Sequence, residues 1–445
     1  MMSQAHLPEA LIVKYDRPVP RYTSYPPANH FSAFTSQHYI NALGSIAPST
    51  SVSVYLHLPF CASLCWYCGC TMKVVNQPAP MARYMANLNH EIDLVTSHLK
   101  HRLPLQHLHL GGGTPTHIPT DELQRTITRL RQVFDFAPNA ELAIEIDPRT
   151  LTAEKAKDLA ACGINRASLG VQDTNPNVQQ AINRVQPFSQ VAQCAQWLRE
   201  AGIKDLNLDL IYGLPLQTPD TIRQTVADAL TLNPTRIALF GYAHVPQVKK
   251  HQKLLERFPL PDAATRRQLF NTAADALINA GYQQVGIDHF VKSDDSLAVA
   301  ATQGTLHRNF QGYTNDNCPV LLGFGVSAIS QLPQCYAQNT TDIKDYATSL
   351  ALDLPPILRG HALTPDDLER RDLIMALMCS YEAIVPQKLL ISALASLQPL
   401  LHDGLITLSG QHLRVTPKGK MLVRIVAACF DSYSQASQKP HARAI

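Results

Sequence analysis

Four cysteines lie close together at Cys61, Cys65, Cys68 and Cys70, directly after the alternating apolar run 52–58. A loop offers no core in which so many thiols could be buried, so this spacing indicates a metal site. Thiolates select zinc, cuprous copper or iron–sulfur clusters. A structural zinc site normally has two separated cysteine pairs. Three cysteines in C-x3-C-x2-C spacing can instead hold three corners of a four-iron cluster and leave the fourth iron open.

An open iron can bind a substrate or cofactor, whereas closed ligation by four cysteines serves electron transfer. Only Gly69 separates Cys68 from Cys70, which makes a second bond to the same cluster awkward, so we expect Cys70 near the cluster and not on it. Zinc, a disulfide pair, a closed cluster and a chance arrangement are the alternatives. The loop resembles the signature of the radical S-adenosylmethionine enzymes, in which the methionine moiety chelates the open iron.

Composition indicates an ordinary globular protein. The 445 residues are 45% hydrophobic and 16% charged, enough for two or three domains with a large core. The 38 basic and 35 acidic residues give a formal net charge of +3, too balanced for a nucleic-acid binder on charge alone. Residues 1–11 do not resemble a signal peptide, and no segment predicts a membrane span. We therefore expect a cytoplasmic protein whose other six cysteines are buried thiols.

Strands and helices are expected to alternate after the cysteine loop. Apolar spacing predicts strands at 52–58, 105–110, 141–146, 166–171, 206–211 and 236–240, and helices at 80–100, 121–134, 153–162, 189–201 and 219–231. About six strands, each followed by a helix, predict an α/β fold, either a parallel barrel or a doubly wound sheet. Polar or glycine-bearing residues follow strand after strand, which favours a barrel, complete or incomplete.

The rest of the chain divides around this barrel. We expect an N-terminal arm at 1–50, extended by its prolines over 17–26, and the barrel at 51–290. A glycine-rich segment at 291–360 is expected to cover the barrel mouth. Residues 361–445 predict helices and a small hairpin, a winged-helix-like domain. Its lack of a basic recognition helix argues against DNA binding.

Several residues at the strand ends could bind a ligand, and each has a plain alternative. Gly111 to Thr114 could let the backbone approach a cofactor or form an ordinary turn. Glu145 could accept two ribose hydroxyls or be a solvated acid. Asp209 and Arg184 could bind charged groups or form a salt bridge. His57 and His109 are expected in the core, and His244 and His307 at the site.

Longer motifs extend the resemblance over nearly the whole chain, and together they are similar to those of the oxygen-independent coproporphyrinogen III oxidases. The motifs are Arg21 to Pro26, Cys61 to Cys70 with its Cys-Gly-Cys ending, Gly111 to Thr116, Gly170 to Asp173, Asn183-Arg184, Asp209 to Pro215, Tyr242 to His244, His307 to Tyr313 and Gly325 to Ser330. The resemblance implies a partial (β/α) TIM-type barrel of the radical SAM type, with an N-terminal arm and a mainly helical C-terminal domain. It also implies one 4Fe-4S cluster and two molecules of S-adenosylmethionine.

By resemblance, specific positions carry these groups. The cluster ligands are Cys61, Cys65 and Cys68. The positions around the first S-adenosylmethionine are Tyr55, Gly112, Glu145 and Ala243. The positions around the second are Tyr67, Gly113, Thr114, Gln172, Arg184, Asp209 and Ile329. Tyr67 stands where many relatives carry Phe, a departure that keeps the aromatic ring.

The implied reaction is the anaerobic oxidative decarboxylation of two propionates of coproporphyrinogen III to vinyl groups, through a 5′-deoxyadenosyl radical. The product is protoporphyrinogen IX, a haem precursor. Cys70 is a candidate catalytic relay, and Arg21, Arg184 and Arg308 are candidates to bind propionates. The expected partners are a reductant such as flavodoxin or ferredoxin and an unidentified electron acceptor, without nucleic acid or membrane, around a monomer.

Two other functions remain open. A radical-SAM-like haem chaperone shares the cluster and barrel, but such proteins typically lack the Cys-Gly-Cys ending and the Arg-Tyr-Thr-Ser-Tyr-Pro arm that are present here. A zinc-stabilised nucleic-acid-binding protein could use the winged C-terminus. Iron and acid-labile sulfide in the purified protein would exclude that second alternative.

Overall fold

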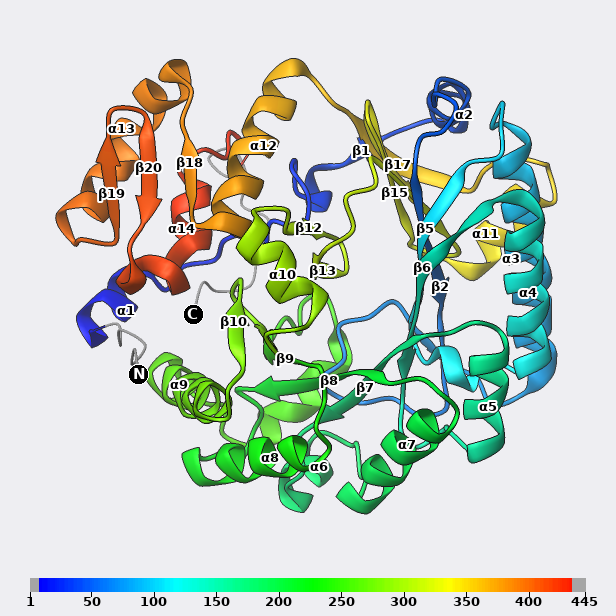
Figure 1. Ribbon diagram of the computed structural model, residues 1–445, viewed down its shortest axis with the longest axis horizontal. Coiled ribbons are helices and arrows are strands. Elements are labelled where there is room, and N and C mark those ends of the chain that lie inside the picture. Colours follow the sequence, from blue (N-terminus) through cyan, green and yellow to red (C-terminus); the bar gives the residue numbers. More distant parts are fainter. Residues whose placement is uncertain (1–7, 434–445) are drawn as a thin grey trace.

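A curved sheet with helices on its outer face forms most of the molecule, and a smaller C-terminal domain lies beside it (Figure 1). The computed structural model describes residues 8–433. The N-terminal arm, shown in blue, runs between the two parts. The expectations for residues 1–7 and 434–445 lie outside the described residues.

Seven parallel strands form the centre of a 13-stranded sheet, in the order β14-β2-β5-β6-β7-β8-β9. Their bounds are β14 (Val320–Phe324), β2 (Val52–Leu58), β5 (Pro104–Gly112), β6 (Asp135–Ile146), β7 (Arg166–Gln172), β8 (Asp205–Tyr212) and β9 (Arg236–Gly241). The helices that follow strands β2 to β9 are α3 (Pro78–Ser97), α4 (Thr120–Val133), α5 (Ala153–Ala161), α7 (Phe188–Glu200), α8 (Pro219–Thr231) and α9 (Ala263–Asn279). The α/β barrel expected from the sequence is confirmed.

The helices form where the sequence places apolar residues on one face, and α5, α8 and α9 also have a side-chain cap at the start. In α3 the buried side chains recur at helical spacing from Met81 to Val95. Thr152 caps α5 by accepting from the Lys155 amide, and Thr218 caps α8 with a reciprocal capping box. These capped helices cover strands that are almost completely buried, so the parallel sheet has the apolar environment that it requires.

The segment 291–360 contributes strands to the sheet as well as cover. Antiparallel strands extend the β14 edge in the order β15, β16, β17, β1, and β11 and β10 extend the β9 edge. Their bounds are β15 (Ile329–Leu332), β16 (Cys335–Asn339), β17 (Ile357–Ala362), β1 (Ser32–Ala33), β11 (His289–Val291) and β10 (Gln283–Val285). The other elements of this segment are α10 (Ser296–Gln303), β12 (His307–Asn309), β13 (Gly312–Thr314) and α11 (Ile343–Leu350), and α11 packs against α3. Shorter elements are α2 (Ser36–Gly44), η1 (Ala28–His30), β3 (Phe60–Cys61), β4 (Lys73–Val74), η2 (Pro115–His117), α6 (Pro176–Ala181) and η3 (Lys250–Arg257).

The C-terminal domain combines helices with a three-stranded sheet. Its elements are α12 (Pro365–Ser380), β18 (Glu382–Ile384), α13 (Gln387–His402), β19 (Ile406–Ser409), β20 (His412–Val415), η4 (Pro417–Leu422) and α14 (Val423–Ala428). The sheet order is β18-β20-β19. Among the described residues, no helix has the length and apolar character needed to cross a membrane.

The N-terminal arm binds this domain through α1 (Glu9–Tyr15) and the extended segment that follows it. Tyr22 Oη donates to Asp431 at 3.0 Å, and Arg424 Nε donates to the carbonyl of Pro20 at 3.0 Å. Tyr22 and Arg424 are both buried. The arm therefore fixes the C-terminal domain against the carboxyl-terminal edge of the barrel strands.

Candidate active site

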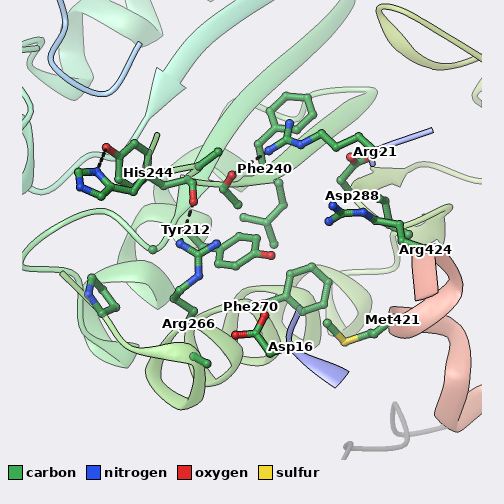
Figure 2. A pocket seen from close by; sticks show the side chains of 18 of the residues that line it. Asp16, Arg21, Tyr212, Phe240, His244, Arg266, Phe270, Asp288, Met421 and Arg424 are labelled. Carbon is green, nitrogen blue, oxygen red and sulfur yellow. Dashed lines mark hydrogen bonds between the residues drawn. The ribbon is translucent and has the colours of Figure 1, made fainter. Parts of the chain in front are cut away.

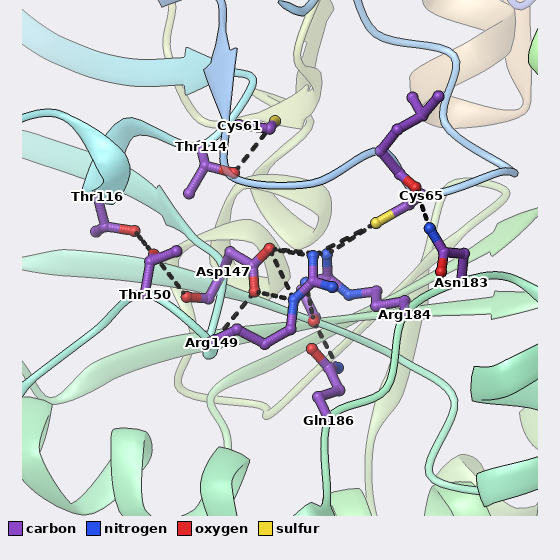
Figure 3. Close-up of polar contacts among 12 residues, drawn as sticks. Cys61, Cys65, Thr114, Thr116, Asp147, Arg149, Thr150, Asn183, Arg184 and Gln186 are labelled. Carbon is purple, nitrogen blue, oxygen red and sulfur yellow. Dashed lines mark hydrogen bonds and ion pairs between the residues drawn. The ribbon is translucent and has the colours of Figure 1, made fainter. Parts of the chain in front are cut away.

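Hydrogen-bond donors surround the sulfurs of the cysteine loop (Figure 3). Cys61 Sγ accepts from Thr114 Oγ1 at 3.3 Å, and Cys68 Sγ accepts from the backbone N–H of Cys70 at 3.4 Å. Cys65 Sγ accepts from the guanidinium groups of Arg149 and Arg184, each at 3.5 Å. Donors of this kind stabilise thiolates and tune the metal group that thiolates hold.

Asp147 holds the two arginines against Cys65. Its Oδ2 lies 2.7 Å from Arg149 Nη2 and 3.0 Å from Arg184 Nη1 (Figure 3). Burial acts to raise the pKa of the Asp147 carboxyl, but Arg184 and Arg149 outweigh it and lower that pKa to about 2. The carboxylate stays ionised and the guanidinium groups stay oriented toward the sulfur.

The donor set of this loop fits an iron–sulfur cluster. Three thiols lie on one loop, and each of their sulfurs accepts a hydrogen bond, as the sulfur ligands of such clusters do. Burial raises the pKa of the Cys61 thiol to about 11, whereas a side-chain hydrogen bond with Cys70 lowers the pKa of Cys68 to about 7. Cys61 therefore needs the positive charge of a bound metal group to ionise fully.

The glycines after β5 allow close backbone packing beside the loop. Gly112 has a φ of +112°, and a Cβ there would lie 2.7 Å from the His57 ring. A Cβ on Gly113 would lie 2.7 Å from the carbonyl oxygen of Phe60. The Gly112 N–H donates to Glu145 Oε2 at 3.1 Å. Only glycine fits these two positions without moving the neighbouring strands.

Glu145 and Tyr55 lie beside these glycines at the strand ends. His109 Nε2 lies 3.2 Å from Glu145 Oε1. Burial acts to raise the pKa of Glu145, but the His109 and Gly112 hydrogen bonds lower it overall and keep a carboxylate there. Tyr55 stacks on the His109 ring, and its hydroxyl lies 3.1 Å from His57 Nδ1. His57 Nε2 donates to the Thr71 carbonyl at 2.8 Å, so neutral Nδ1 accepts from Tyr55.

A pocket of about 190 Å³ lies inside the barrel, and we call it the barrel pocket. Four carboxylates and two arginines contribute to its wall: Glu141, Glu145, Asp209, Asp316, Arg166 and Arg236. The two arginines bind carboxylates of the chain, since Arg166 Nε lies 2.9 Å from Glu141 and Arg236 Nε lies 2.8 Å from Asp295. Asp209 accepts from Ser168 at 2.9 Å and from Asn207 at 2.8 Å. Burial, with Glu145 nearby, raises the pKa of Asp209 to about 6.

A second and larger pocket, of about 470 Å³, lies between the barrel, the arm and the C-terminal domain (Figure 2). We call it the junction pocket. Its wall is aromatic and apolar at Tyr212, Phe240, Phe270 and Met421. Its cations come from three parts of the chain: Arg21 from the arm, Arg266 from α9, and Lys420 and Arg424 from the C-terminal domain. Figure 2 shows the three guanidinium groups around one space. Phe240 lines both pockets, so the pockets adjoin.

The structure brings most of the candidate residues to one edge of the barrel. Tyr67, Gly113, Thr114 and Arg184 lie at the cysteine loop, and Tyr55, Gly112 and Glu145 lie next to it. Gln172 ends β7 with a φ of +66°, and Asp209 faces the barrel pocket. Ala243 lines the junction pocket instead. Ile329 begins β15 and lies against Gly323 of β14, and Gly323 pairs with Tyr55 of β2. Glu145 is on β6, which lies beyond β5 on the other side of β2, so Ile329 and Glu145 are on opposite sides of β2.

The cations and histidines expected at the site lie in different parts of the structure. Arg184 is 6% exposed and binds Asp147 and Cys65, so it faces the cysteine loop. Arg308 is buried against the Tyr313 ring. Of the three cations expected from the sequence, Arg21 is therefore the one that lines the junction pocket. His244 lines that pocket too, whereas His307 is exposed on β12.

Sequence reasoning missed several residues that support the site. Arg149 follows Asp147-Pro148 at a strand end, and that position could have drawn attention to it. Arg266 and Arg424 lie on helices remote from any motif, and no sequence signal separates them from surface arginines. His109 was expected in the core, and its Nε2 lies 3.2 Å from Glu145 Oε1, where it orients that carboxylate. His251 and Gln252 donate to the carbonyls of Cys68 and Tyr67 at 2.8 and 2.9 Å.

Comparison with known proteins first defines the class. Residues 55–229, from β2 to α8, match the family model described as the Radical SAM superfamily. A radical SAM protein uses a 4Fe-4S cluster and S-adenosylmethionine. The buried Arg184 Nε, which has no hydrogen-bond partner among the described residues, and the acceptors Glu145 and Asp209 fit a charged, polar cofactor at this edge.

Similarity over the full length then gives the family. The chain is 45% identical over 447 residues to the oxygen-independent coproporphyrinogen III oxidase of Bradyrhizobium diazoefficiens, covering 98% of this chain and 99% of the relative. It is 40% identical to that of Escherichia coli, covering 95% of each. The solved structure of the Escherichia coli enzyme, described as a radical SAM enzyme, superposes with a TM-score of 0.90 at 37% identity, over 97% of this chain and 100% of that one. The chain belongs to the family of oxygen-independent coproporphyrinogen III oxidases.

Proposed function

We propose that the chain catalyses the anaerobic oxidative decarboxylation of two propionate side chains of coproporphyrinogen III to vinyl groups, giving protoporphyrinogen IX. The observation that carries this proposal is the junction pocket, which combines aromatic walls with four cations and adjoins the barrel pocket at Phe240. A tetrapyrrole with several carboxylates needs both features.

The cofactor positions are a further part of the proposal. Cys61, Cys65 and Cys68 would hold the 4Fe-4S cluster, supported by the donors that surround their sulfurs. When bound, the cluster supplies the electron that cleaves S-adenosylmethionine and yields the 5′-deoxyadenosyl radical. The tasks of the chain are to bind, to orient and to keep water away from the reacting groups.

Two molecules of S-adenosylmethionine are proposed. The first would lie against Tyr55, Gly112, Glu145 and Ala243. The second would lie against Tyr67, Gly113, Thr114, Gln172, Arg184, Asp209 and Ile329. Glu145 and Asp209 offer carboxylate acceptors beside the same barrel pocket, and Arg184 offers a free N–H for an anionic group. The contacts of Ala243 with the junction pocket support a place for it between cofactor and substrate.

Arg21, Arg266 and Arg424 would bind the propionates. Arg266 Nη1 donates to the Tyr242 carbonyl at 2.8 Å, and Arg21 makes one longer bond of 3.3 Å to the Gly241 carbonyl. Among the described residues, Arg21 and Arg266 donate no further side-chain hydrogen bond, so their remaining N–H groups are available to carboxylates. Burial, together with Arg21 and Arg308 nearby, lowers the pKa of Arg424 to about 10, so positive charge is concentrated there. An anionic substrate relieves this repulsion.

Cys70 stays a candidate relay of an electron or hydrogen. It lies at the exposed end of the loop, and its N–H donates to Cys68 Sγ. We also propose a monomer that takes electrons from a flavodoxin or ferredoxin and passes the substrate electrons to a separate acceptor.

The test is product analysis under anaerobic conditions. Reconstituted protein is incubated with coproporphyrinogen III, S-adenosylmethionine and dithionite, and the porphyrinogens are separated by mass. We expect a product that has lost two carbon dioxide molecules and four hydrogens, and 5′-deoxyadenosine beside it. Cys65→Ala is expected to keep the fold but lose bound iron and turnover. Stable haem uptake without any vinyl product would instead favour the haem chaperone and contradict the proposal.

A further inference from the structure

The outer side of the cysteine loop is covered by two other segments of the chain. The Trp66 N–H donates to the Ile182 carbonyl at 3.0 Å, and Asn183 Nδ2 donates to the Leu64 carbonyl at 2.7 Å. From the other direction, Lys249 Nζ donates to the Cys70 carbonyl at 2.9 Å. Segments 62–77, 174–190 and 245–258 therefore form one surface around the loop, which we call the loop face.

The loop face is basic and almost free of carboxylates. Segments 62–77 and 174–190 contain no Asp or Glu, and segment 245–258 contains only Glu256. Glu256 Oε1 lies 3.1 Å from His244 Nε2, so this carboxylate already has a partner. Lys250, Lys253 and Arg257 are exposed on the same segment. Over the whole chain, basic and acidic residues number 38 and 35, so this imbalance is local.

A hollow of about 400 Å³ opens on the loop face at Trp66, the residue that follows Cys65 in the sequence. Trp66 lines it together with Arg257, Leu216 and polar side chains, without any carboxylate. The Arg257 guanidinium lies 5.7 Å from the centre of the Trp66 ring. Leu216, which lines the hollow, is 40% exposed, and two apolar side chains of the loop-face segments, Val185 and Val248, are 59% and 61% exposed. Aromatic and arginine side chains in a partly apolar hollow are typical of protein contact sites.

We propose that the loop face is the docking site of a small acidic one-electron carrier protein. Basic side chains would attract and orient the acidic rim of the carrier, and the hollow at Trp66 would receive the apolar edge around its redox group. In each encounter the reduced carrier loses one electron and the cluster gains it. An interface of this kind is small and transient. The inference rests on the proposed function, because that function requires electrons to enter at this loop.

The contacts of Lys249, His251 and Gln252 make the docking segment part of the cluster support. All three donate to carbonyls of the cysteine loop, at residues 70, 68 and 67. A carrier seated on η3 is therefore one hydrogen bond away from the loop that holds the cluster. Sites on the opposite, amino-terminal ends of the strands have no such connection, since the barrel lies between them and the loop.

The test compares two triple variants of equal charge change. Lys250→Glu, Lys253→Glu and Arg257→Glu reverse the loop face at exposed positions. Lys100→Glu, Lys157→Glu and Lys204→Glu reverse exposed residues away from the cysteine loop, two of them at the amino-terminal ends of β5 and β8. An acidic flavodoxin serves as the probe. Its dissociation constant is measured by titration at low and at high salt, without substrate, and the rate at which its hydroquinone reduces the cluster is followed by stopped flow.

We expect the loop-face variant to bind flavodoxin about tenfold more weakly or worse at low salt, and the difference to shrink as salt is added. Cluster reduction by flavodoxin slows in parallel, while reduction by dithionite keeps its rate. The second variant stays within about twofold of the unmodified protein. The proposal is overturned if the loop-face variant binds normally, or if both variants lose the same affinity. Because binding is read without substrate, a failure of the decarboxylation would appear separately, as absent turnover with dithionite.

Discussion

The barrel pocket and the junction pocket adjoin at Phe240, yet their charges differ in sign. The barrel pocket has four carboxylates against two arginines, and both arginines bind carboxylates of the chain. The junction pocket has four cations against three carboxylates. Two of those carboxylates are engaged, because Asp262 caps α9 and Asp288 binds His289 at 2.7 Å.

This difference separates the two ligands of the proposed reaction. The sulfonium and amino groups of S-adenosylmethionine are cationic, and the propionates of the substrate are anionic. Each ligand meets favourable charge in one pocket and unfavourable charge in the other. On the proposed assignment, this charge pattern would place cofactor and substrate on the two sides of Phe240.

The largest effect is expected from removing two cations of the junction pocket. In the double variant Arg21→Gln and Arg266→Gln, two charge-assisted hydrogen bonds to propionates are lost, about 1.5 kcal/mol each. KM for coproporphyrinogen III should rise about a hundredfold, while the dissociation constant of S-adenosylmethionine stays the same. Steady-state kinetics and equilibrium dialysis measure the two values. Lys204→Gln, exposed at the far end of β8, is the matched control. Equal losses for both ligands would contradict the separation of the pockets.

The next effect concerns pH and the charge of Asp209. Burial raises the pKa of this carboxyl from 3.8 to about 6. Between these values the unfolded chain has released the proton and the folded protein still holds it. The contribution of Asp209 to the free energy of unfolding of the metal-free protein should therefore fall as pH rises from about 4 to 6, by on the order of 2 kcal/mol. Asp209→Asn should remove this contribution, measured by urea unfolding at pH 4 to 7, while the buried carboxyls of Glu91 and Asp173, whose pKa values are also raised, keep theirs.

The control for this experiment is Asp205→Asn, at the exposed start of the same strand. It should leave the pH dependence as it is in the unmodified protein. If Asp209→Asn keeps the original dependence, the negative charge of the barrel pocket is not costly to the apoprotein. The comparison between the pockets would then lose its electrostatic basis.

A somewhat smaller effect is expected from Glu145→Gln. The substitution keeps an acceptor for the Gly112 N–H but removes the negative charge at the strand end. S-adenosylmethionine should bind about tenfold more weakly, since a hydrogen bond to a charged group contributes about 1.5 kcal/mol. KM for coproporphyrinogen III should change by less than about twofold. A larger change for the porphyrinogen than for S-adenosylmethionine would reverse the assignment.

The smallest effect is expected from Lys420→Gln at the exposed rim of the junction pocket. This side chain is exposed to solvent, where a single ion pair contributes at most about 1 kcal/mol. KM for the porphyrinogen should rise about twofold and the difference should vanish at high salt. An effect as large as that of Arg266 would show that the rim, and not the interior of the junction pocket, binds the carboxylates.

Local patterns predicted most elements of the fold closely. The expected helix 219–231 matches α8 at both ends, and the expected strand 52–58 matches β2. Strand 141–146 was expected too short, because β6 begins at Asp135, where Pro138 and Asn139 interrupt the apolar alternation. Asp135 and Phe136 pair with β5, Pro138 and Asn139 lie in an irregular stretch where the register shifts, and pairing resumes at Glu141.

The place of residues 320–324 in the sheet was beyond the reach of the sequence. These residues were expected to cover the barrel, and they form β14, which pairs in parallel with β2 although more than 260 residues separate the two. Periodicity describes a strand but not its partner. The partner depends on which edge of the sheet remains open after the preceding strands have paired.

The sequence alone determined the cysteine loop, the alternation of strands and helices, and the family resemblance, because ligand spacing and apolar periodicity are local properties of the chain. Only the tertiary structure decided which charges share a pocket. Arg21, Arg266 and Arg424 are far apart in sequence and meet at one cavity. Arg184, expected as a substrate cation, turns toward Cys65 because Asp147 lies 3.0 Å from it. Coulombic attraction acts through space, and distances in space are set by packing.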